Sequence, residues 1–433
     1  MTGTLTSVEL FAGGGGMALG TRQAGFHHVA LVEWNKNAAA ILRHNAKTHP
    51  ELWAPDHVYE EDVRLWLQTT AIRSNIDLVA GGPPCQPFSL AGVHAGDTDD
   101  RNMFPAAIAA VRRFRPCFAV FENVPGLTRP SFAPYFSYIK HQLEKPTVTP
   151  KSDELWTDHD ARVTKAQPAS TRYAVHEHLL EAADYGLPQN RRRVVLVAIR
   201  ADLPGADTWS APEPTHSRDS LLYDQWVTGD YWTEHGEAMP ELPDGLEGRV
   251  RDLKEGGRPA MERWQTVRDC ISELPEPINR MPSASFANHE GIPGARAYPK
   301  HSGSPLDWPS KTIKAGVHGV SGGEAMIRFD DDTLRYFTVR EAARIQGFPD
   351  SYEFPVARSR SMGAIGNAVA VPLAEILTRH LTKLLSCDQL SRKGPMASGM
   401  GRPQASLGRR QPRSPQRQLA QQMPRAQPDS LIS

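Results

Sequence analysis

Short apolar segments that alternate with stretches of helical character are the feature that most constrains the fold of this chain. The apolar runs are rich in β-branched or aromatic residues and span residues 7–10, 29–32, 76–80, 118–121 and 194–199. Helical stretches such as 37–45 and 106–114 separate most of them. Short buried strands alternating with helices predict an α/β fold with a doubly wound, mostly parallel sheet. Ligands bind such sheets at the carboxyl ends of the strands, so the residues that follow each strand are the first candidates for a functional site.

The pattern changes after about residue 202. Residues 202–310 hold five of the nine Trp together with many Pro and Gly, and they show no clear period. This composition, without a regular period, is typical of a loop-rich second domain with short strands. Regular structure is expected to return further on, where Thr338 and Glu341 have the spacing of a capping box. A second amphipathic helix is expected to begin at Pro372, a residue type favoured in the first turn.

The net charge of zero conceals an uneven distribution of charge. Residues 391–433 contain eight Lys or Arg and one acidic residue, Asp429, a balance of +7, so the rest of the chain carries −7. An enzyme that acts on nucleic acid and has an acidic body must concentrate its positive charge in a cleft. The segment beyond Cys387 is rich in Pro, Gln, Ser, Arg and Gly and is predicted to be disordered.

The cysteines and the apolar content exclude several classes of protein. Cys85, Cys117, Cys270 and Cys387 are widely spaced and include no Cys-x-x-Cys pair, so neither a zinc site nor a disulfide framework is predicted, and no metal is expected. No run approaches the roughly 18 apolar residues of a membrane span. The first ten residues lack the basic and apolar stretches of a secretory signal, so a cytoplasmic location is expected.

Two motifs near the N-terminus are typical of a nucleotide site. The sequence FAGGGG at 11–16 follows the first strand, and its glycines allow a tight turn and a close approach to a ligand. Taken alone, this run is equally compatible with an ordinary turn. Glu33 and Trp34 end the next strand about 20 residues later, where a carboxylate can accept hydrogen bonds from ribose hydroxyls. Trp34 alone would be interpreted as a core anchor, but beside the glycine loop it is a candidate to stack on adenine.

Three further motifs carry reactive or charged groups. The sequence GGPPCQPFS at 81–89 places Cys85 between prolines on a stiff loop after a strand, which favours a reactive thiol over an inert buried one. Glu122 caps another apolar strand and is a candidate acid. Arg191 and Arg193 lie within three adjacent arginines before a strand. These arginines are either a solvated patch or, because side chains alternate along a strand, a two-pronged clamp for an anion or a carbonyl.

Six motifs in this order resemble those of the cytosine-5 DNA methyltransferases of bacterial restriction-modification systems. The matching motifs are VELFAG at 8–13, PCQPFS at 84–89, ENV at 122–124, QxRxR at 189–193, REAARIQGFP at 340–349 and GNAV at 366–369. The resemblance implies a Rossmann-like S-adenosylmethionine-dependent methyltransferase fold with an inserted, smaller target recognition domain. The implied divisions are a catalytic domain at 1–200 and 331–387, a recognition domain at 201–330 and a disordered basic tail at 388–433.

The resemblance also implies a role for each site residue. Cys85 would add to carbon 6 of cytosine, because carbon 5 alone is too weak a nucleophile to accept a methyl group. Glu122 would act as the acid at ring nitrogen 3, Arg193 would contact the cytosine carbonyl and Glu122, and Arg191 would lie nearby in the catalytic site. The residues expected to bind S-adenosylmethionine are Phe11, Gly13, Gly15, Glu33 (ribose), Trp34 (adenine), Asp62 (adenine amino group), Pro84, Asn367 and Val369.

The expected partner is double-stranded DNA carrying a short specific site, with the target base flipped out of the helix. Residues 90–102 are expected to be either a lid over the base or an ordinary surface loop, and Thr312 is expected near the DNA. The basic tail either strengthens DNA binding through phosphates or is a dispensable extension. We expect a monomer and a cognate restriction endonuclease that acts on the same site without a stable complex.

Three alternatives to a DNA methyltransferase are weighed against these motifs. A transfer-RNA cytosine-5 methyltransferase of the same fold would lack a recognition domain as large as 201–330. A catalytically silent DNA-binding homologue would not need Cys85, Glu122 and Arg193 intact. A nicotinamide dehydrogenase would require the Gly-x-Gly-x-x-Gly register, which the FAGGGG loop lacks. The sequence of the recognised DNA site is not predicted.

Overall fold

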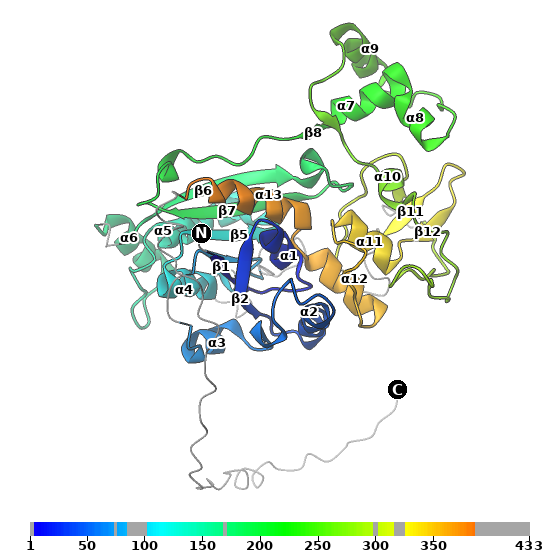
Figure 1. Ribbon diagram of the computed structural model, residues 1–433. Coiled ribbons are helices and arrows are strands. Elements are labelled where there is room, and N and C mark those ends of the chain that lie inside the picture. The colour runs from blue at the N-terminus through cyan, green and yellow to red at the C-terminus, as the bar shows by residue number, and fades with distance from the viewer. Residues whose placement is uncertain are drawn as a thin grey trace, which may run out of the picture. The chain divides into compact units, whose positions relative to one another are not determined.

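The computed structural model describes residues 4–72, 76–84, 102–167, 171–297, 302–315 and 325–385. Its centre is a seven-stranded sheet of order β3-β2-β1-β4-β5-β7-β6 (Figure 1). The strands are β1 (Leu5–Leu10), β2 (Phe26–Val32), β3 (Val58–Tyr59), β4 (Leu78–Gly81), β5 (Phe118–Asn123), β6 (Tyr173–Glu181) and β7 (Arg192–Arg200). The first five are parallel, whereas β7 runs antiparallel to both β5 and β6. The predicted doubly wound, mostly parallel sheet is therefore confirmed, with one antiparallel strand, β7, next to the edge strand β6 that the sequence did not predict.

All five predicted strands are present, and two further strands were not predicted. β3 has only two residues, which is too short for a pattern. β6 reads YAVHEHLLE and is half exposed along most of its length, because it is an edge strand of the sheet. Its polar residues conceal the apolar run that identifies a buried strand.

Helices cover both faces of the sheet. Alternate residues of β4 and β5 point to opposite faces, so Val79 and Phe121 join one core cluster while Leu78 and Val120 join another. The first cluster packs against α3, α4 and α5, and the second against α1 and α13. The helices of the first 200 residues are α1 (Gly16–Gln23), α2 (Lys36–Thr48), α3 (Val63–Thr69), α4 (Phe104–Phe114), α5 (Ala133–Glu144) and α6 (Trp156–Lys165).

The C-terminal part returns to the sheet through α11 (Val339–Ile345), α12 (Arg358–Asn367) and α13 (Val371–Thr382). The capping box predicted at Thr338 and Glu341 is present, and both reciprocal hydrogen bonds form. α13 begins at Val371, one residue before the predicted Pro372, and lies against α1 (Figure 1). Gly20 of α1 permits this close approach, because a Cβ there would meet Ala374 and the backbone of Glu375 within 2.7–2.8 Å. The fold around the central sheet is thus completed by contacts between residues as far apart in the sequence as Gly20 and Ala374.

The span Arg358–Thr382 has the length and the mean hydropathy (1.3) of a membrane-crossing helix. However, 67% of its apolar window is buried inside the fold. Extended backbone at Ala368 and Ala370 divides the span into α12 and α13. A buried helix pair of a globular core has the same properties, so this span is weak support for a membrane protein.

The region between β7 and α11 is built from short elements. They are β8 (His216–Ser217), α7 (Arg218–Tyr223), α8 (Asp230–His235), α9 (Glu247–Gly256), β9 (Glu262–Arg263), α10 (Val267–Ile271), β10 (Ser304–Pro305), β11 (Met326–Arg328) and β12 (Leu334–Tyr336). The tryptophans noted in the sequence form much of a small core of their own, which comprises Leu221, Tyr231 and Trp232 with Trp226, Trp264 and Trp308. β11 pairs with β12 across residue 330, so this small sheet crosses the predicted boundary at 330, and the domain limits remain a prediction.

Candidate active site

The glycine loop follows β1 in an unusual backbone conformation. Phe11, Gly13 and Gly15 have φ values of +56°, +54° and +89°. The left-handed region is accessible to glycine without steric cost, which explains two of the three positions. A Cβ on Gly15 would collide with the hydroxyl of Tyr352 and lie 2.9 Å from Leu42 Cδ2. A Cβ on Gly13 would instead meet nothing closer than 3.9 Å, so the loop leaves open space at this residue.

Glu33 and Trp34 lie at the end of β2, beside the glycine loop. One Glu33 oxygen accepts the backbone N–H of Gly13 at 2.8 Å and the other accepts that of Asn35 at 2.7 Å. Burial raises the pKa of Glu33, and these backbone donors offset part of the rise. Trp34 is 75% exposed, which rules out the alternative that it is a core anchor and leaves its ring available to a ligand.

A second carboxyl group in the same region was missed by the sequence analysis. Glu9 is only 1% exposed in β1, and neither of its oxygens has a well-formed hydrogen bond to any described residue. Burial raises the pKa of Glu9 well above its ordinary value, while the N–H of Ala18 lowers it in part. Burial raises the pKa of Tyr352, and the nearby Glu9 raises it further; the Tyr352 hydroxyl donates to the carbonyl of Gly14. An acid inside the apolar strand LTSVEL was the available sequence signal.

Asp62, the predicted adenine contact, has a structural role in the fold. It caps α3 by accepting the backbone N–H of Arg64 at 2.7 Å, and it pairs with the Arg64 guanidinium. The Arg64 contacts hold the pKa of Asp62 below its ordinary value. A hydrogen bond from the N–H of Glu61 to the carbonyl of Glu33 (3.2 Å) joins this segment to the end of β2. Its contact with adenine remains a prediction.

Glu122 and Arg193 form the central ion pair of the site. Glu122 is at the carboxyl end of β5, and Arg193 is near the start of β7. Because β7 runs antiparallel to β5, with Asn123 opposite Val194, the start of β7 lies at the end of β5. The Nε of Arg193 is 2.8 Å from Oε1 of Glu122, and both side chains are about 90% buried.

Arg191 approaches the same carboxylate but has different partners. Its Nη2 is 3.9 Å from Oε1 of Glu122, and its side chain is 2% exposed. The guanidinium donates to the carbonyls of Ile313, Gly366 and Ala368. Burial lowers the pKa of Arg191, and the nearby Arg193 lowers it further. The two arginines do face one way, as the alternation predicted, and the interpretation as a solvated patch is wrong.

The loop that carries Cys85 begins beside Glu122. Cys85 itself and residues 90–101 of the expected lid lie outside the described residues. The described stem is well placed: Asn123 Nδ2 donates to the carbonyl of Pro83 at 3.0 Å. A Cβ on Gly82 would lie 3.7 Å from Oε2 of Glu122 and 3.9 Å from Val369. The stem therefore passes beside the Glu122 carboxylate before it reaches Pro84, the last described residue before Cys85.

The remaining predicted residues lie around this centre. Val369 is buried in the core, where its Cγ2 would lie 3.9 Å from a Cβ on Gly82. Asn367 is exposed at the end of α12. Thr312 Oγ1 donates to the carbonyl of Asn190 at 2.6 Å, which places Thr312 beside the arginine motif. Contact of Thr312 with DNA remains a prediction.

Two buried amides that had no predicted role also hold the site together. Gln189 Nε2 donates to Gln346 Oε1 at 3.1 Å, and Gln189 Oε1 accepts the N–H of Ile313 at 3.0 Å. Gln189 belongs to the QxRxR motif, and that motif was the only sequence signal for it.

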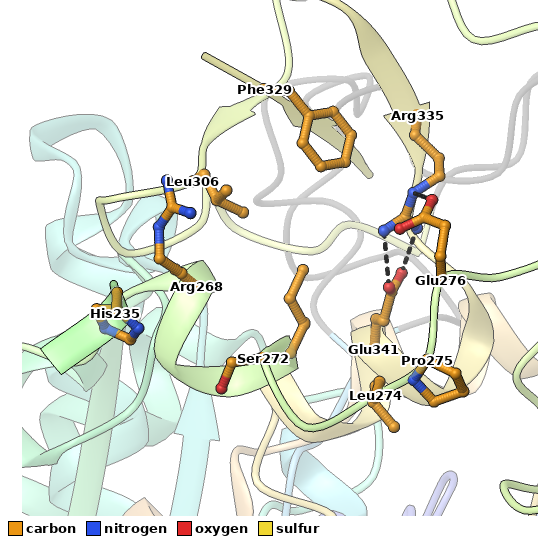
Figure 2. Close-up of a pocket in the computed structure, with 11 residues that line it drawn as sticks. His235, Arg268, Ser272, Leu274, Pro275, Glu276, Leu306, Phe329, Arg335 and Glu341 are labelled. Atoms are coloured by element: carbon orange, nitrogen blue, oxygen red, sulfur yellow. Dashed lines mark hydrogen bonds and ion pairs between the residues drawn. The ribbon is translucent and has the colours of Figure 1, made fainter. Parts of the chain in front are cut away.

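A separate cavity lies between α10, β12 and α11. Its volume is about 240 Å³, and Figure 2 shows Arg335 and Glu341 paired on one side of it, by two hydrogen bonds of 2.9 and 3.0 Å. Near one end, Glu234, His235 and Asp269 bring ligand atoms within 4.8 Å of one another. The guanidinium of Arg263 already pairs with Glu234 and Asp269 at 3.0 Å each, so we infer no metal at this position.

Comparison with known proteins agrees with this geometry. The family described as C-5 cytosine-specific DNA methylase matches residues 5–146 and 158–383. The Type II methyltransferase M.NgoMIV of Neisseria gonorrhoeae is 31% identical over 88% of this chain and 98% of its own length. M.NaeI of Lentzea aerocolonigenes, also a Type II methyltransferase, is 33% identical over 89% of this chain and 76% of its own.

A solved structure supports the fold. A prophage-encoded candidate DNA modification methyltransferase from E. coli has a TM-score of 0.52 and 19% identity, covering 88% of this chain and 99% of its own. Its similarity concerns the fold alone, whereas the family match extends over most of the sequence. The chain belongs to the C-5 cytosine-specific DNA methylase family and is a DNA cytosine-5 methyltransferase.

Proposed function

We propose that this enzyme methylates carbon 5 of one cytosine within a short specific sequence of double-stranded DNA, with Cys85 as the nucleophile and S-adenosylmethionine as the methyl donor. The observation that carries the proposal is the position of the Glu122–Arg193 pair. Its 2.8 Å contact lies at the strand edge where Gly82 and the Pro83 stem lead to Cys85. An acid, a cation and a nucleophile-bearing loop therefore converge on one place.

The proposed reaction begins when the Cys85 thiolate adds to carbon 6 of the flipped cytosine. Glu122 donates a proton to ring nitrogen 3, and Arg193 donates to the ring carbonyl oxygen and orients Glu122, so the electron pair of the ring becomes available at carbon 5. The cosubstrate would supply an electrophilic methyl group: the bond from carbon 5 to the methyl carbon forms as the methyl–sulfur bond breaks, and the electron pair stays on the sulfur of the departing thioether. A base, water in our proposal, removes the proton from carbon 5, the Cys85–carbon 6 bond breaks to release the thiolate, and ring nitrogen 3 returns its proton to Glu122.

The residues at the ends of β1 and β2 fit S-adenosylmethionine. Open space at Gly13 would admit the ligand close to the backbone, and the Glu33 oxygens retain lone pairs for ribose hydroxyls. The exposed ring of Trp34 offers a face for adenine. The buried carboxyl group of Glu9 has no well-formed hydrogen bond to a described residue, and a polar ligand or a water molecule beneath the loop can supply a donor. Phe11, Gly15, Pro84, Asn367 and Val369 complete the proposed binding set, with Asp62 at the adenine amino group.

The biological setting follows from the relatives, which are named Type II methyltransferases. We propose a modification enzyme that acts as a monomer in the cytoplasm and protects host DNA from an endonuclease of the same specificity, without a stable complex between the two. The region 201–330 would read the DNA site, and its size favours duplex DNA over transfer RNA as the substrate.

The test is to express the chain in a host without cytosine-5 methylation and to map modified cytosines by bisulfite sequencing. The wild-type protein should modify one sequence context, and Cys85→Ser should modify none. Cys117→Ala is the matched control, because Cys117 is half buried just before β5, at the opposite end of that strand from Glu122. DNA containing 5-fluorocytosine should trap the wild-type enzyme covalently. Methylated transfer RNA with unmodified DNA would overturn the substrate, and an active Cys85→Ser protein would overturn the mechanism.

A further inference from the structure

Three segments that are far apart in the sequence meet around the guanidinium of Arg191. Ile313 lies in the irregular segment 311–315, Gly366 is in the last turn of α12, and Ala368 is in the link between α12 and α13. Arg191 donates to the Ile313 carbonyl at 3.3 Å, to the Gly366 carbonyl through both Nη atoms at 3.2 Å, and to the Ala368 carbonyl at 2.7 Å. These contacts use most of the donors that an arginine offers.

The geometry separates Arg191 from its neighbour in the motif. Arg193 makes the close contact to Glu122 at 2.8 Å, whereas Arg191 lies 3.9 Å away, beyond hydrogen-bond distance. Arg191 is fully buried at 1% exposure, and its nearest partners are backbone carbonyls. Because most of its N–H groups already donate to these carbonyls, the Arg191 guanidinium has few donors left to bind a substrate.

The loop that Arg191 holds is the one that carries Asn367 and Val369. The two carbonyls that it binds, Gly366 and Ala368, flank Asn367 directly. Gln346 supports the same loop from another side, because its Nε2 donates to the Ile365 carbonyl at 2.7 Å.

The backbone of the 313–315 segment closes the third side of this loop. A Cβ on Gly366 would lie 2.5 Å from the backbone of Lys314 and Ala315. The conformation of the 366–369 loop is therefore imposed from three directions, and the Arg191 guanidinium contributes charged donors to the Gly366 and Ala368 carbonyls.

We propose that Arg191 is a positioning residue for cosubstrate binding: it shapes the 366–369 loop that closes the S-adenosylmethionine pocket, and it does not contact the cytosine. The inference rests on the proposed function, because it requires Asn367 and Val369 to border that pocket. It makes a prediction that a base-contacting arginine would not satisfy. Loss of Arg191 weakens cosubstrate binding even without DNA, and excess cosubstrate restores the rate.

The test compares Arg191→Met and Arg191→Lys with Arg193→Met in the full-length protein. Calorimetric titration with S-adenosylmethionine in the absence of DNA is the first readout. We expect Arg191→Met to weaken binding about ten-fold or more, as loss of several charge-assisted hydrogen bonds implies, and Arg191→Lys to weaken it less. Arg193→Met should bind within about two-fold of wild type. In turnover, Arg191→Lys should show a raised KM for the cosubstrate with a near-normal kcat, whereas Arg193→Met should lose kcat.

Gln346→Met gives a second, independent perturbation of the same loop. It removes a donor to the 366–369 segment without touching any arginine, so it should also weaken cosubstrate binding, and thermal unfolding will show whether each variant is folded. Unchanged cosubstrate affinity in the folded Arg191 variants, with a fall in kcat that saturating cosubstrate does not restore, overturns the inference. A wild-type protein that binds no S-adenosylmethionine contradicts the proposed function itself, so the two failures are distinguishable.

Discussion

Three glycine-to-alanine substitutions test whether the glycine loop holds a ligand or is only a turn. Gly13, Gly15 and Gly25 all have positive φ, at +54°, +89° and +102°. An L-residue in the left-handed region costs about 1–2 kcal/mol, so all three variants share this penalty. They differ in what the added methyl group meets, and the structure gives that difference directly.

Gly25→Ala places its methyl group in open space, with nothing within 4 Å. It should therefore lose only the strain energy of about 1–2 kcal/mol. Gly15→Ala would collide with Tyr352 and Leu42, and overpacking adds about 1–3 kcal/mol. The expected loss of unfolding free energy is about 2–5 kcal/mol for Gly15→Ala. Gly13→Ala should resemble Gly25→Ala in stability, since its nearest neighbour would be 3.9 Å away.

Ligand binding then separates Gly13 from Gly25. Both variants should unfold in denaturant at similar midpoints, but the Gly13 methyl group would occupy space that we assign to S-adenosylmethionine. Titration calorimetry should show a loss of affinity of ten-fold or more, about 1.4 kcal/mol, for Gly13→Ala, and no loss for Gly25→Ala. Equal affinity in the two variants would refute the ligand interpretation of the loop. Equal stability of Gly15→Ala and Gly25→Ala would refute the packing of Tyr352 on the loop.

Three further predictions concern single buried groups. Glu122→Gln should lower the methylation rate about 100-fold or more, because the acid is lost. It should also lower the unfolding free energy by about 3 kcal/mol, because Arg193 is left buried without its anion. Single-turnover kinetics measures the first effect and urea unfolding the second. A variant with the wild-type methylation rate would remove Glu122 from the mechanism. Burial lowers the pKa of His28 from 6.5 to about 4, so the unfolded chain binds more protons between these values, and stability present above pH 6.5 is lost as the pH falls towards 4. The unfolding free energy lost between these pH values should amount to about 3 kcal/mol, and His28→Gln should not show this loss. Parallel pH profiles of Tm for the wild-type and His28→Gln proteins would contradict the prediction. Thr338→Ala removes the capping box of α11 and a partner of His289, and it should cost about 1–2 kcal/mol in chemical denaturation; a midpoint equal to that of wild type would show that the cap contributes nothing.

The sequence identified most elements that have a strong local pattern. The five apolar runs became strands of the central sheet, and the capping box at Thr338 and the helix start near Pro372 are both present. The helices α7, α8 and α9 were not predicted, because they are only six to ten residues long and lie among many Pro and Gly. A helix of this length has too few turns for its period to emerge.

By itself, the sequence determined the order of the chemical motifs and the strands after which they stand, because apolar period and residue type are local properties. Only the tertiary structure decided which groups meet. The antiparallel direction of β7 brings Arg193 to Glu122, and no pattern within β7 specifies that direction. The carbonyl partners of Arg191 lie 122 to 177 positions further along the chain. Glu9 shows the same limit, since its burial depends on long-range packing that brings Ala18 of α1 and Tyr352 close to its carboxyl group. Long-range packing positions these groups, and the residues next to each of them in the sequence do not predict it.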